Sequence, residues 1–210
     1  MIVYCATTNV GKLKEFRKAA EIAGCVVEVA PGLDVIPVPD ETGSTFEANA
    51  ILKAEYYGAH TAGYLFCDDS GLEVDALGGA PGVHSARYAG GAGDAANNAL
   101  LLKNLEGIVD RAGRFVSVIA LVENGRLVQT FRGTVEGVIA SAESGPHGFG
   151  YDPLFCYPPW NCTFGEAELA RKAGVSHRAH ALKLMFEFVA LPRNHSNSIA
   201  TYRSFPFRST

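Results

Sequence analysis

The sequence lacks the features that would place a protein in or across a membrane. No apolar run approaches the roughly 18–20 residues that a bilayer-spanning helix needs. The opening stretch MIVYCATTNVGK has no basic leader before its short apolar run and no small-residue cleavage site. We therefore expect a cytoplasmic protein without a membrane partner.

Paired cysteines are absent as well. The five cysteines are odd in number and scattered, and none forms a C-x-x-C pair. A disulfide framework or a zinc site is therefore not expected. The thiols are predicted to be reduced and buried, as is usual for a cytosolic protein.

An excess of positive charge is the third missing feature. The net charge is −4 and the pI is about 5.9, so no overall field attracts nucleic acid or an anionic membrane. Nucleic acid is therefore not expected as a partner, although a local cationic pocket is compatible with this composition. The 210 residues, 48% of them hydrophobic, fit a single domain over 1–210 with a sizeable core. The polar end, 191–210, is predicted to be a loosely held tail.

Strand-like and helix-like segments alternate in the first third of the chain. Short apolar runs over 2–7, 25–29 and 64–68 predict strands, and apolar residues at helical spacing predict a helix over 9–24. Farther on, Asn124-Gly125 joins two long strand-like runs and predicts a hairpin. The pattern predicts an α/β fold with a central, largely buried sheet.

Two predicted helix starts carry cations. Asn9 can cap the first helix, and Lys12 follows in its first turn, where the helix dipole disfavours a cation but free N–H groups suit a phosphate. The stretch is not a Walker loop, because that motif needs Gly at Ala6 and Ser or Thr at Leu13. Taken alone, the stretch fits an ordinary capped helix with a solvated lysine.

The second start follows Glu41. Ser44 and Glu47 form a capping box that opens a helix containing Lys53. Glu41 is not needed for capping, and an exposed acidic turn with one surface lysine would be commonplace.

Two adjacent aspartates, Asp68 and Asp69, follow the apolar run YLFC. Side chains of neighbouring strand residues point to opposite faces, so the two carboxylates diverge unless the strand ends. Ser70-Gly71 predicts that it ends there, with one aspartate facing a cleft and the other holding the loop. Ligands of open α/β sheets bind beyond the carboxyl ends of strands.

A Gly-flanked aromatic and a third cation complete the polar loops. In GFGYDPLF (148–155) two glycines flank Phe149, so the backbone and the ring can approach a planar ligand. Ser176 can cap a last helix that presents His177 and Arg178. Cations, carboxylates and an aromatic together suit a Mg²⁺-bound nucleotide with several phosphates.

Five ordered motifs resemble the inosine triphosphate pyrophosphatase family, also called Ham1- or RdgB-type non-standard purine triphosphate pyrophosphatases, over residues 1–190. They are TTNVGK, ETGSTFEANAILKA, DDSGLEVDALGGAPGVHSARYAG, GFGYDPLF and SHRAHALK. The resemblance implies an elongated, two-lobed α/β fold with a long mixed sheet flanked by helices and an active-site cleft between the lobes. It also implies a homodimer.

The implied activity is hydrolysis of ITP, dITP and XTP to the monophosphate and pyrophosphate with Mg²⁺, for which Mn²⁺ can substitute, so that the nucleotide pool is cleansed. By resemblance, Glu41 and Asp69 bind the metal, and Asp69 is also the base for the attacking water. Asp69, Lys53 and Lys12 form the catalytic set. The implied substrate-binding residues are Thr7, Thr8, Asn9, Val10, Gly11, Lys12, Lys53, Ser70, Phe149, Gly150, Tyr151, Asp152, Lys172, His177 and Arg178.

Two other functions compete with this one. A Maf-like pyrophosphatase would act on pyrimidine or modified nucleotides, but the SHR and GFGYDP motifs disfavour it. A nucleotide-binding protein without hydrolysis would not need Asp69 as a base.

Overall fold

The computed structural model describes residues 2–191, so the predicted tail over 191–210 lies outside the described residues except for Leu191. The described strands are β1 (Ile2–Cys5), β2 (Val26–Val29), β3 (Tyr64–Val74), β4 (Ala112–Glu123), β5 (Arg126–Ile139), β6 (Phe155–Tyr157) and β7 (Cys162–Thr163). The α-helices are α1 (Val10–Ile22), α2 (Phe46–Gly58), α3 (Asp94–Asn104), α4 (Leu169–Lys172) and α5 (His177–Ala190). The 3₁₀ helices are η1 (Leu33–Val35), η2 (Asp75–Leu77), η3 (Gly82–Arg87) and η4 (Pro158–Trp160).

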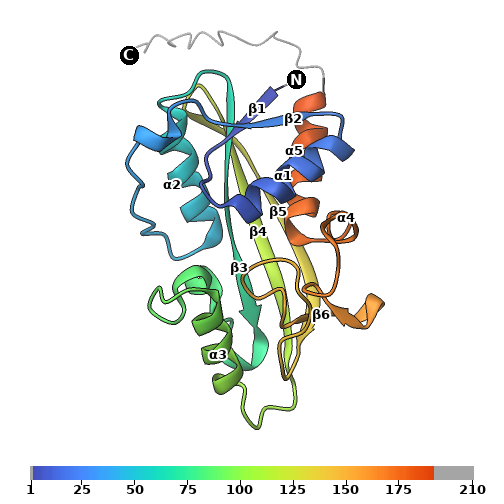
Figure 1. Cartoon of the computed structure of the whole chain (residues 1–210). Helices are drawn as coiled ribbons and strands as arrows, with labels where there is room; N and C mark the ends of the chain where they lie inside the picture. The colour runs from blue at the N-terminus through green and yellow to red at the C-terminus, as the bar shows by residue number, and fades with distance from the viewer. Residues whose placement is uncertain (1, 192–210) are drawn as a thin grey trace, which may run out of the picture.

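The strands form one mixed sheet in the order β2-β1-β3-β4-β5-β6-β7. β1 pairs in parallel with β2 and β3, and every later pair is antiparallel. β3, β4 and β5, with 11, 12 and 14 residues, run along the long axis of the molecule (Figure 1). The predicted α/β fold with a long mixed sheet is therefore confirmed.

Helices cover both faces of the sheet at one end. α1 and α5 pack on one face around Phe16, Phe66 and Met185, and α2 packs on the other around Ala54 and Cys67. A third cluster, which includes Leu101 of α3, fills the opposite end below the middle of Figure 1. The two ends are the lobes that the long strands join.

Several predicted local features are confirmed. The Asn9 side chain accepts a hydrogen bond from the Lys12 N–H and caps α1. Ser176 caps α5 in the same way. β4 ends at Glu123 and β5 begins at Arg126, and the two residues between them have the positive φ angles that a tight hairpin turn requires.

Two predictions about local structure are wrong. Thr45, not Ser44, caps α2, and Glu47 accepts a hydrogen bond from Thr130 on β5 instead of closing a capping box. β3 does not end at the aspartates but runs on to Val74, because its pairing with β4 continues there through hydrogen-bonded neighbours. The Gly-rich segment over 71–93 therefore starts as strand and contains η2 and η3.

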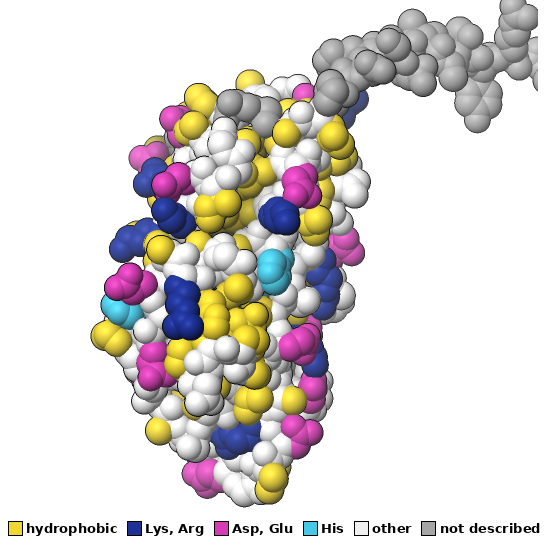
Figure 2. All heavy atoms as spheres, turned by 90° about the vertical axis from the view of Figure 1, so that its right-hand side faces the viewer, with side chains coloured by type: hydrophobic (Ala, Val, Ile, Leu, Met, Phe, Trp, Pro, Cys, Tyr) yellow, Lys and Arg dark blue, Asp and Glu magenta, His cyan; other side chains and the backbone are white. Residues whose placement is uncertain are grey.

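Figure 2 shows the side of the molecule that carries α5. Hydrophobic side chains lie there between isolated basic and acidic ones, and both signs of charge occur close together. Within residues 2–191, no helix is long and apolar enough to cross a membrane.

Candidate active site

The candidate site lies along the part of β3 that β1 does not cover. β1 pairs with β3 only up to Cys5–Phe66, and the chain then leaves the sheet to start α1. Beyond Phe66 this edge of β3 is open to side chains, and the Lys53 ammonium donates to the Asp68 carbonyl oxygen at 3.0 Å. The early end of β1 thus leaves room for a site beside the two aspartates.

Asp68 faces α1 and α5. Its carboxylate lies 2.8 Å from the Lys12 Nζ and 3.4 Å from the Arg178 Nε, and it accepts hydrogen bonds from the Ser117 and Ser70 hydroxyls. Burial alone would raise the pKa of Asp68, but Lys12 and Arg178 hold it well below its usual value. Asp68 is therefore a buried carboxylate that is charged at neutral pH.

Asp69 faces α2. Its carboxylate lies 2.7 Å from the Lys53 Nζ and accepts a longer hydrogen bond, 3.4 Å, from the Asn49 amide. Glu41 also binds the Lys53 Nζ at 2.7 Å. Burial, supported by the nearby Glu41 charge, raises the pKa of Asp69 although Lys53 opposes the shift.

The predicted alternation of the two aspartates is confirmed, but the predicted strand end beside them and the loop-holding role of one of them are wrong. They diverge because they lie within a continuing strand, where neighbouring side chains alternate between faces. The contacts of Asp68 are cations and hydroxyls, not the backbone N–H groups of a loop, so it does not hold a turn.

A second group of buried charges lies next to the Asp68 face. The Lys172 Nζ is 2.6 Å from both Glu15 and Asp152, and Glu15 also lies 2.8 Å from the Arg178 Nη1. All four side chains are at most 7% exposed. Because removal of one member leaves a buried charge unpaired, at a cost of about 3–5 kcal/mol, the group holds these side chains in place.

The loop with the Gly-flanked aromatic crosses this charged group. The Phe149 ring lies 5.1 Å from the Arg178 guanidinium carbon and 5.3 Å from the Lys172 Nζ. It also packs against Gly11, where an added Cβ would come within 2.6 Å of the ring. Gly11 therefore allows the α1 start and the Phe149 loop to meet.

α3 anchors the same loop from the other side. Asp94 accepts a hydrogen bond from the Gly150 N–H at 2.7 Å, and the Asn98 amide donates to the Gly150 carbonyl at 3.2 Å. The Tyr151 hydroxyl donates to the Ser85 carbonyl at 2.8 Å. The loop is thus fixed by both lobes.

His177 is fully enclosed beside the charged group. Its ring stacks on Phe115 with 4.7 Å between centroids, and neither ring nitrogen has a hydrogen-bond partner among residues 2–191. Burial lowers its pKa well below the usual value, and Arg178 and Lys172 add to the effect. The imidazole is therefore neutral and has unused hydrogen-bonding capacity.

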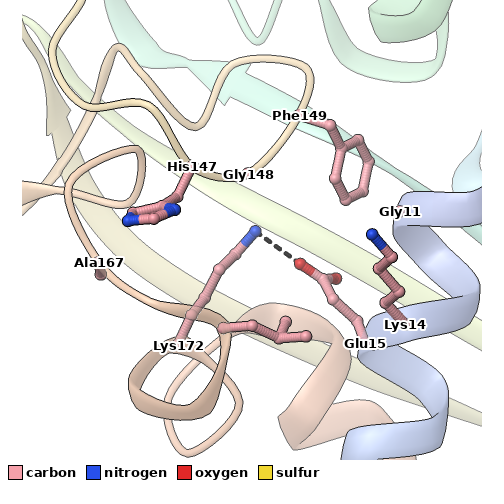
Figure 3. A pocket seen from close by; sticks show the side chains of 9 residues that line it. Gly11, Lys14, Glu15, His147, Gly148, Phe149, Ala167 and Lys172 are labelled. Atoms are coloured by element: carbon pink, nitrogen blue, oxygen red, sulfur yellow. Dashed lines mark ion pairs between the residues drawn. The ribbon is translucent and has the colours of Figure 1, made fainter.

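Two cavities flank the Phe149 ring. The smaller, about 110 Å³, is lined by Asn9, Lys12, Ser70, Gly71, Ser85, Ala86, Asp94, Phe115, Phe149, Gly150, Tyr151, Asp152 and Arg178. The larger, about 380 Å³ and drawn in Figure 3, is lined by Gly11, Lys14, Glu15, His147, Gly148, Phe149, Ala167, Leu169 and Lys172. Together these two cavities make up the pocket around Phe149, and a buried cation lines each, Lys172 the larger and Arg178 the smaller.

The carboxylates on the α2 face fit a divalent cation. Glu41 and Asp69 both direct an oxygen at one cation, the Lys53 ammonium. Two carboxylates completed by phosphate oxygens form a ligand set that Mg²⁺ accepts. No group of three or more potential protein ligands occurs in residues 2–191, so a bound Mg²⁺ would need ligands from substrate and water.

Comparisons with known proteins identify the family of this chain. Residues 3–188 match the sequence profile of the Ham1 family. The chain belongs to the Ham1 family. It is 48% identical over 184 residues to the dITP/XTP pyrophosphatase of an Exiguobacterium species, covering 87% of this chain and 94% of that one.

Solved structures give the same result. The Ham1 protein of Staphylococcus aureus is 39% identical with a TM-score of 0.79, and that of Coxiella burnetii is 36% identical with a TM-score of 0.80. Each comparison covers 90% of this chain and 98% of the other.

Most of the predicted site residues of this Ham1-family chain lie together. Glu41, Lys53 and Asp69 form the α2-face cluster. Thr7, Thr8, Val10 and His177 line neither cavity, although the Thr7 hydroxyl accepts a hydrogen bond from the Asn9 N–H. The others line one or both cavities.

Sequence reasoning missed several residues of the pocket. Glu15, Lys14, Asp94, Asn98 and His147 were not singled out. Glu15 could have been found, because an acidic residue three positions after Lys12 on α1 shares its helix face. The remaining four depend on contacts between distant segments.

Proposed function

We propose that this chain hydrolyses non-standard purine nucleoside triphosphates, namely ITP, dITP and XTP, to the monophosphate and pyrophosphate. One observation carries the proposal. Two carboxylates and a lysine, Asp69, Glu41 and Lys53, lie on one face of β3, and a pocket lined by hydrogen-bond donors lies on the other face. The names of the Ham1 relatives support it.

The pocket favours a purine that carries an oxygen at C6. Arg178 uses three of its five N–H groups on Asp68, Glu15 and Ser70, which leaves two for a ligand. Hypoxanthine and xanthine present an acceptor oxygen at C6, whereas adenine presents an amino donor. An unpaired amine facing these donors costs about 1–3 kcal/mol, so ATP is disfavoured.

The triphosphate would lie along the open edge of β3. Lys12 and Lys53 bring positive charge to the two sides of this edge, and the α1 N-terminus adds free N–H groups. Charge of this sign stabilises the pyrophosphate leaving group as it forms.

Asp69 would act as the general base. Its raised pKa brings a carboxylate closer to the range in which it accepts a proton from water. The water oxygen bonds to the α-phosphorus, the bond from that phosphorus to the bridging oxygen breaks, and pyrophosphate leaves. Glu41 and Asp69 would hold Mg²⁺, or Mn²⁺ in its place, which neutralises phosphate charge and lowers the pKa of water when bound.

A substrate panel tests the proposal. Purified full-length protein with Mg²⁺ is assayed for pyrophosphate and orthophosphate release from ITP, dITP, XTP, GTP, ATP and pyrimidine triphosphates. We expect pyrophosphate from the first three at rates at least about tenfold above ATP, a ratio that corresponds to about 1.4 kcal/mol.

Other outcomes distinguish the competing functions. A preference for pyrimidine nucleotides would favour a Maf-like activity, and tight binding without product would favour a nucleotide-binding protein. Release of orthophosphate alone would contradict attack at the α-phosphorus. The homodimer implied by the sequence resemblance stays a prediction for solution measurements.

A further inference from the structure

The larger cavity beside Phe149 has a rim that the proposed chemistry does not use. Lys14 of α1 and His147 of the loop before Phe149 both line it, and they lie on opposite sides of the Lys172–Glu15 ion pair (Figure 3). Unlike Lys172, both rim residues are exposed. A ligand that fills this cavity would therefore meet them at its outer edge.

The charge of Lys14 has no counter-charge in the part of the chain that the structure describes. Among the described residues no carboxylate lies within ion-pair distance of Lys14, and the His147 ring makes no hydrogen bond with any of them. Lys172, in contrast, is bound by Glu15 and Asp152 at 2.6 Å each. The side chains around the cavity thus carry two ammonium groups against one carboxylate, with the imidazole as a further polar group.

Lys172, the buried donor that lines this cavity, cannot by itself separate the purines that carry an oxygen at C6. Hypoxanthine, xanthine and guanine all present that oxygen, and they differ at C2. Hypoxanthine has a hydrogen there, guanine an amino donor, and xanthine a second carbonyl oxygen. Xanthine also loses a ring proton near neutral pH, so it is the most electron-rich of the three at this edge.

We infer that Lys14 and His147 are specificity-determining residues that favour a xanthine base over hypoxanthine and guanine. The inference rests on the proposed function and adds a preference at C2. Lys14 donates to the C2 oxygen and attracts the negative ring, and His147 adds a donor from the opposite side of the cavity. The 2-amino group of guanine would meet donors instead of acceptors, which disfavours GTP.

The test compares Lys14→Met and His147→Ala with the wild-type chain. The kcat/KM for XTP, ITP and GTP is measured from pyrophosphate release, and XMP and IMP binding is measured by calorimetry. In Lys14→Met we expect a loss of about tenfold for XTP, the size of one charge-assisted hydrogen bond, and less than about twofold for ITP. His147→Ala should lower XTP turnover by about threefold, and XMP binding should weaken in parallel.

Lys18→Met is the matched control. Lys18 lies on the same helix, pairs with Glu21 at 2.8 Å and lines neither cavity, and its replacement removes the same net charge. The XTP-to-ITP ratio should stay unchanged in this variant. Melting temperatures close to wild type would confirm that all three variants fold.

The outcomes separate the two proposals. If the wild-type chain releases pyrophosphate from none of these nucleotides, the proposed function fails. If it acts on XTP and ITP but Lys14→Met lowers both equally, or Lys18→Met shifts the ratio as much, the rim does not determine specificity and the proposed function stands.

Discussion

Asp68 and Asp69 are neighbours in sequence and both are buried, yet their pKa values shift in opposite directions. Asp68 meets two cations and two hydroxyls on the α1–α5 face, and its pKa is lowered. Asp69 meets one cation, which it shares with Glu41, and its pKa is raised. Burial raises the pKa of both carboxylates, and the cations and hydroxyls around Asp68 outweigh that effect whereas the single shared cation at Asp69 does not.

The opposite pKa shifts give the two aspartates different roles, one in stability and one in catalysis. A carboxylate with a lowered pKa stabilises the folded chain and is a poor proton acceptor. One with a raised pKa contributes less to stability and is closer to the range of a useful base. The two faces of one strand can thus be assigned a supporting and a reactive carboxylate.

The largest expected effect is the loss of turnover in Asp69→Asn. Without a proton acceptor, kcat for dITP should fall about a thousandfold, within the usual range for general-base catalysis. The free energy of unfolding should stay equal or rise slightly, because the folded state already disfavours the charged form of Asp69. Pyrophosphate release and denaturant unfolding measure the two quantities, and retained turnover would remove Asp69 from the mechanism.

Asp68→Asn should give the opposite pattern. Lys12 and Arg178 lose a buried counter-charge, so we expect the free energy of unfolding to fall by about 3 kcal/mol. The loss in kcat, corrected for folded protein, should be smaller than that of Asp69→Asn. Denaturant titration of both variants in one buffer provides the comparison.

The pH dependence checks the assignment of Asp68. Its folded pKa is lowered, so its stabilising contribution is complete above the unfolded value, about 3.9, and declines as the pH falls below it. The difference in unfolding free energy between wild type and Asp68→Asn should therefore be constant from about pH 5 to 7, where Asp68 is charged in both the folded and the unfolded state. It should shrink below about pH 4. A difference that shrank as the pH rose would contradict the lowered pKa.

Local sequence patterns predicted much of the fold. The Asn9 cap, the Ser176 cap and the Asn124-Gly125 hairpin depend on side chains and backbone angles within a few residues, and all three are confirmed. The end of β3 was wrong because Ser70-Gly71 resembles a turn, whereas pairing with β4 keeps it extended. Strand length is a property of the partner strand, which no local pattern contains.

In the site, as in the fold, local features could be predicted from the sequence and contacts between distant segments could not. Lys12 and Arg178 could be singled out because cations in the first turn of a helix are unusual, whereas Lys53 near an acidic turn is commonplace and gained its role from the resemblance. That Lys53 joins Asp69 to Glu41, and that Arg178 joins Asp68 to Glu15, depends on segments up to 163 residues apart. The resemblance to a family supplied roles for these residues but not their pairing.

The smallest predicted effect concerns the cation on the Asp69 face. In Lys53→Met, Glu41 and Asp69 lose their shared ammonium and repel each other, so a divalent cation should relieve more repulsion than in the wild type. We expect Mg²⁺ to bind about tenfold more tightly, a gain of about 1.4 kcal/mol, seen as a larger Mg²⁺-dependent rise in melting temperature without nucleotide. Adding Glu41→Gln to Lys53→Met should remove that gain. If Mg²⁺ raised the melting temperature equally in wild type and Lys53→Met, Glu41 and Asp69 would not form the metal site. The reactive carboxylates would then not be those on the α2 face of β3.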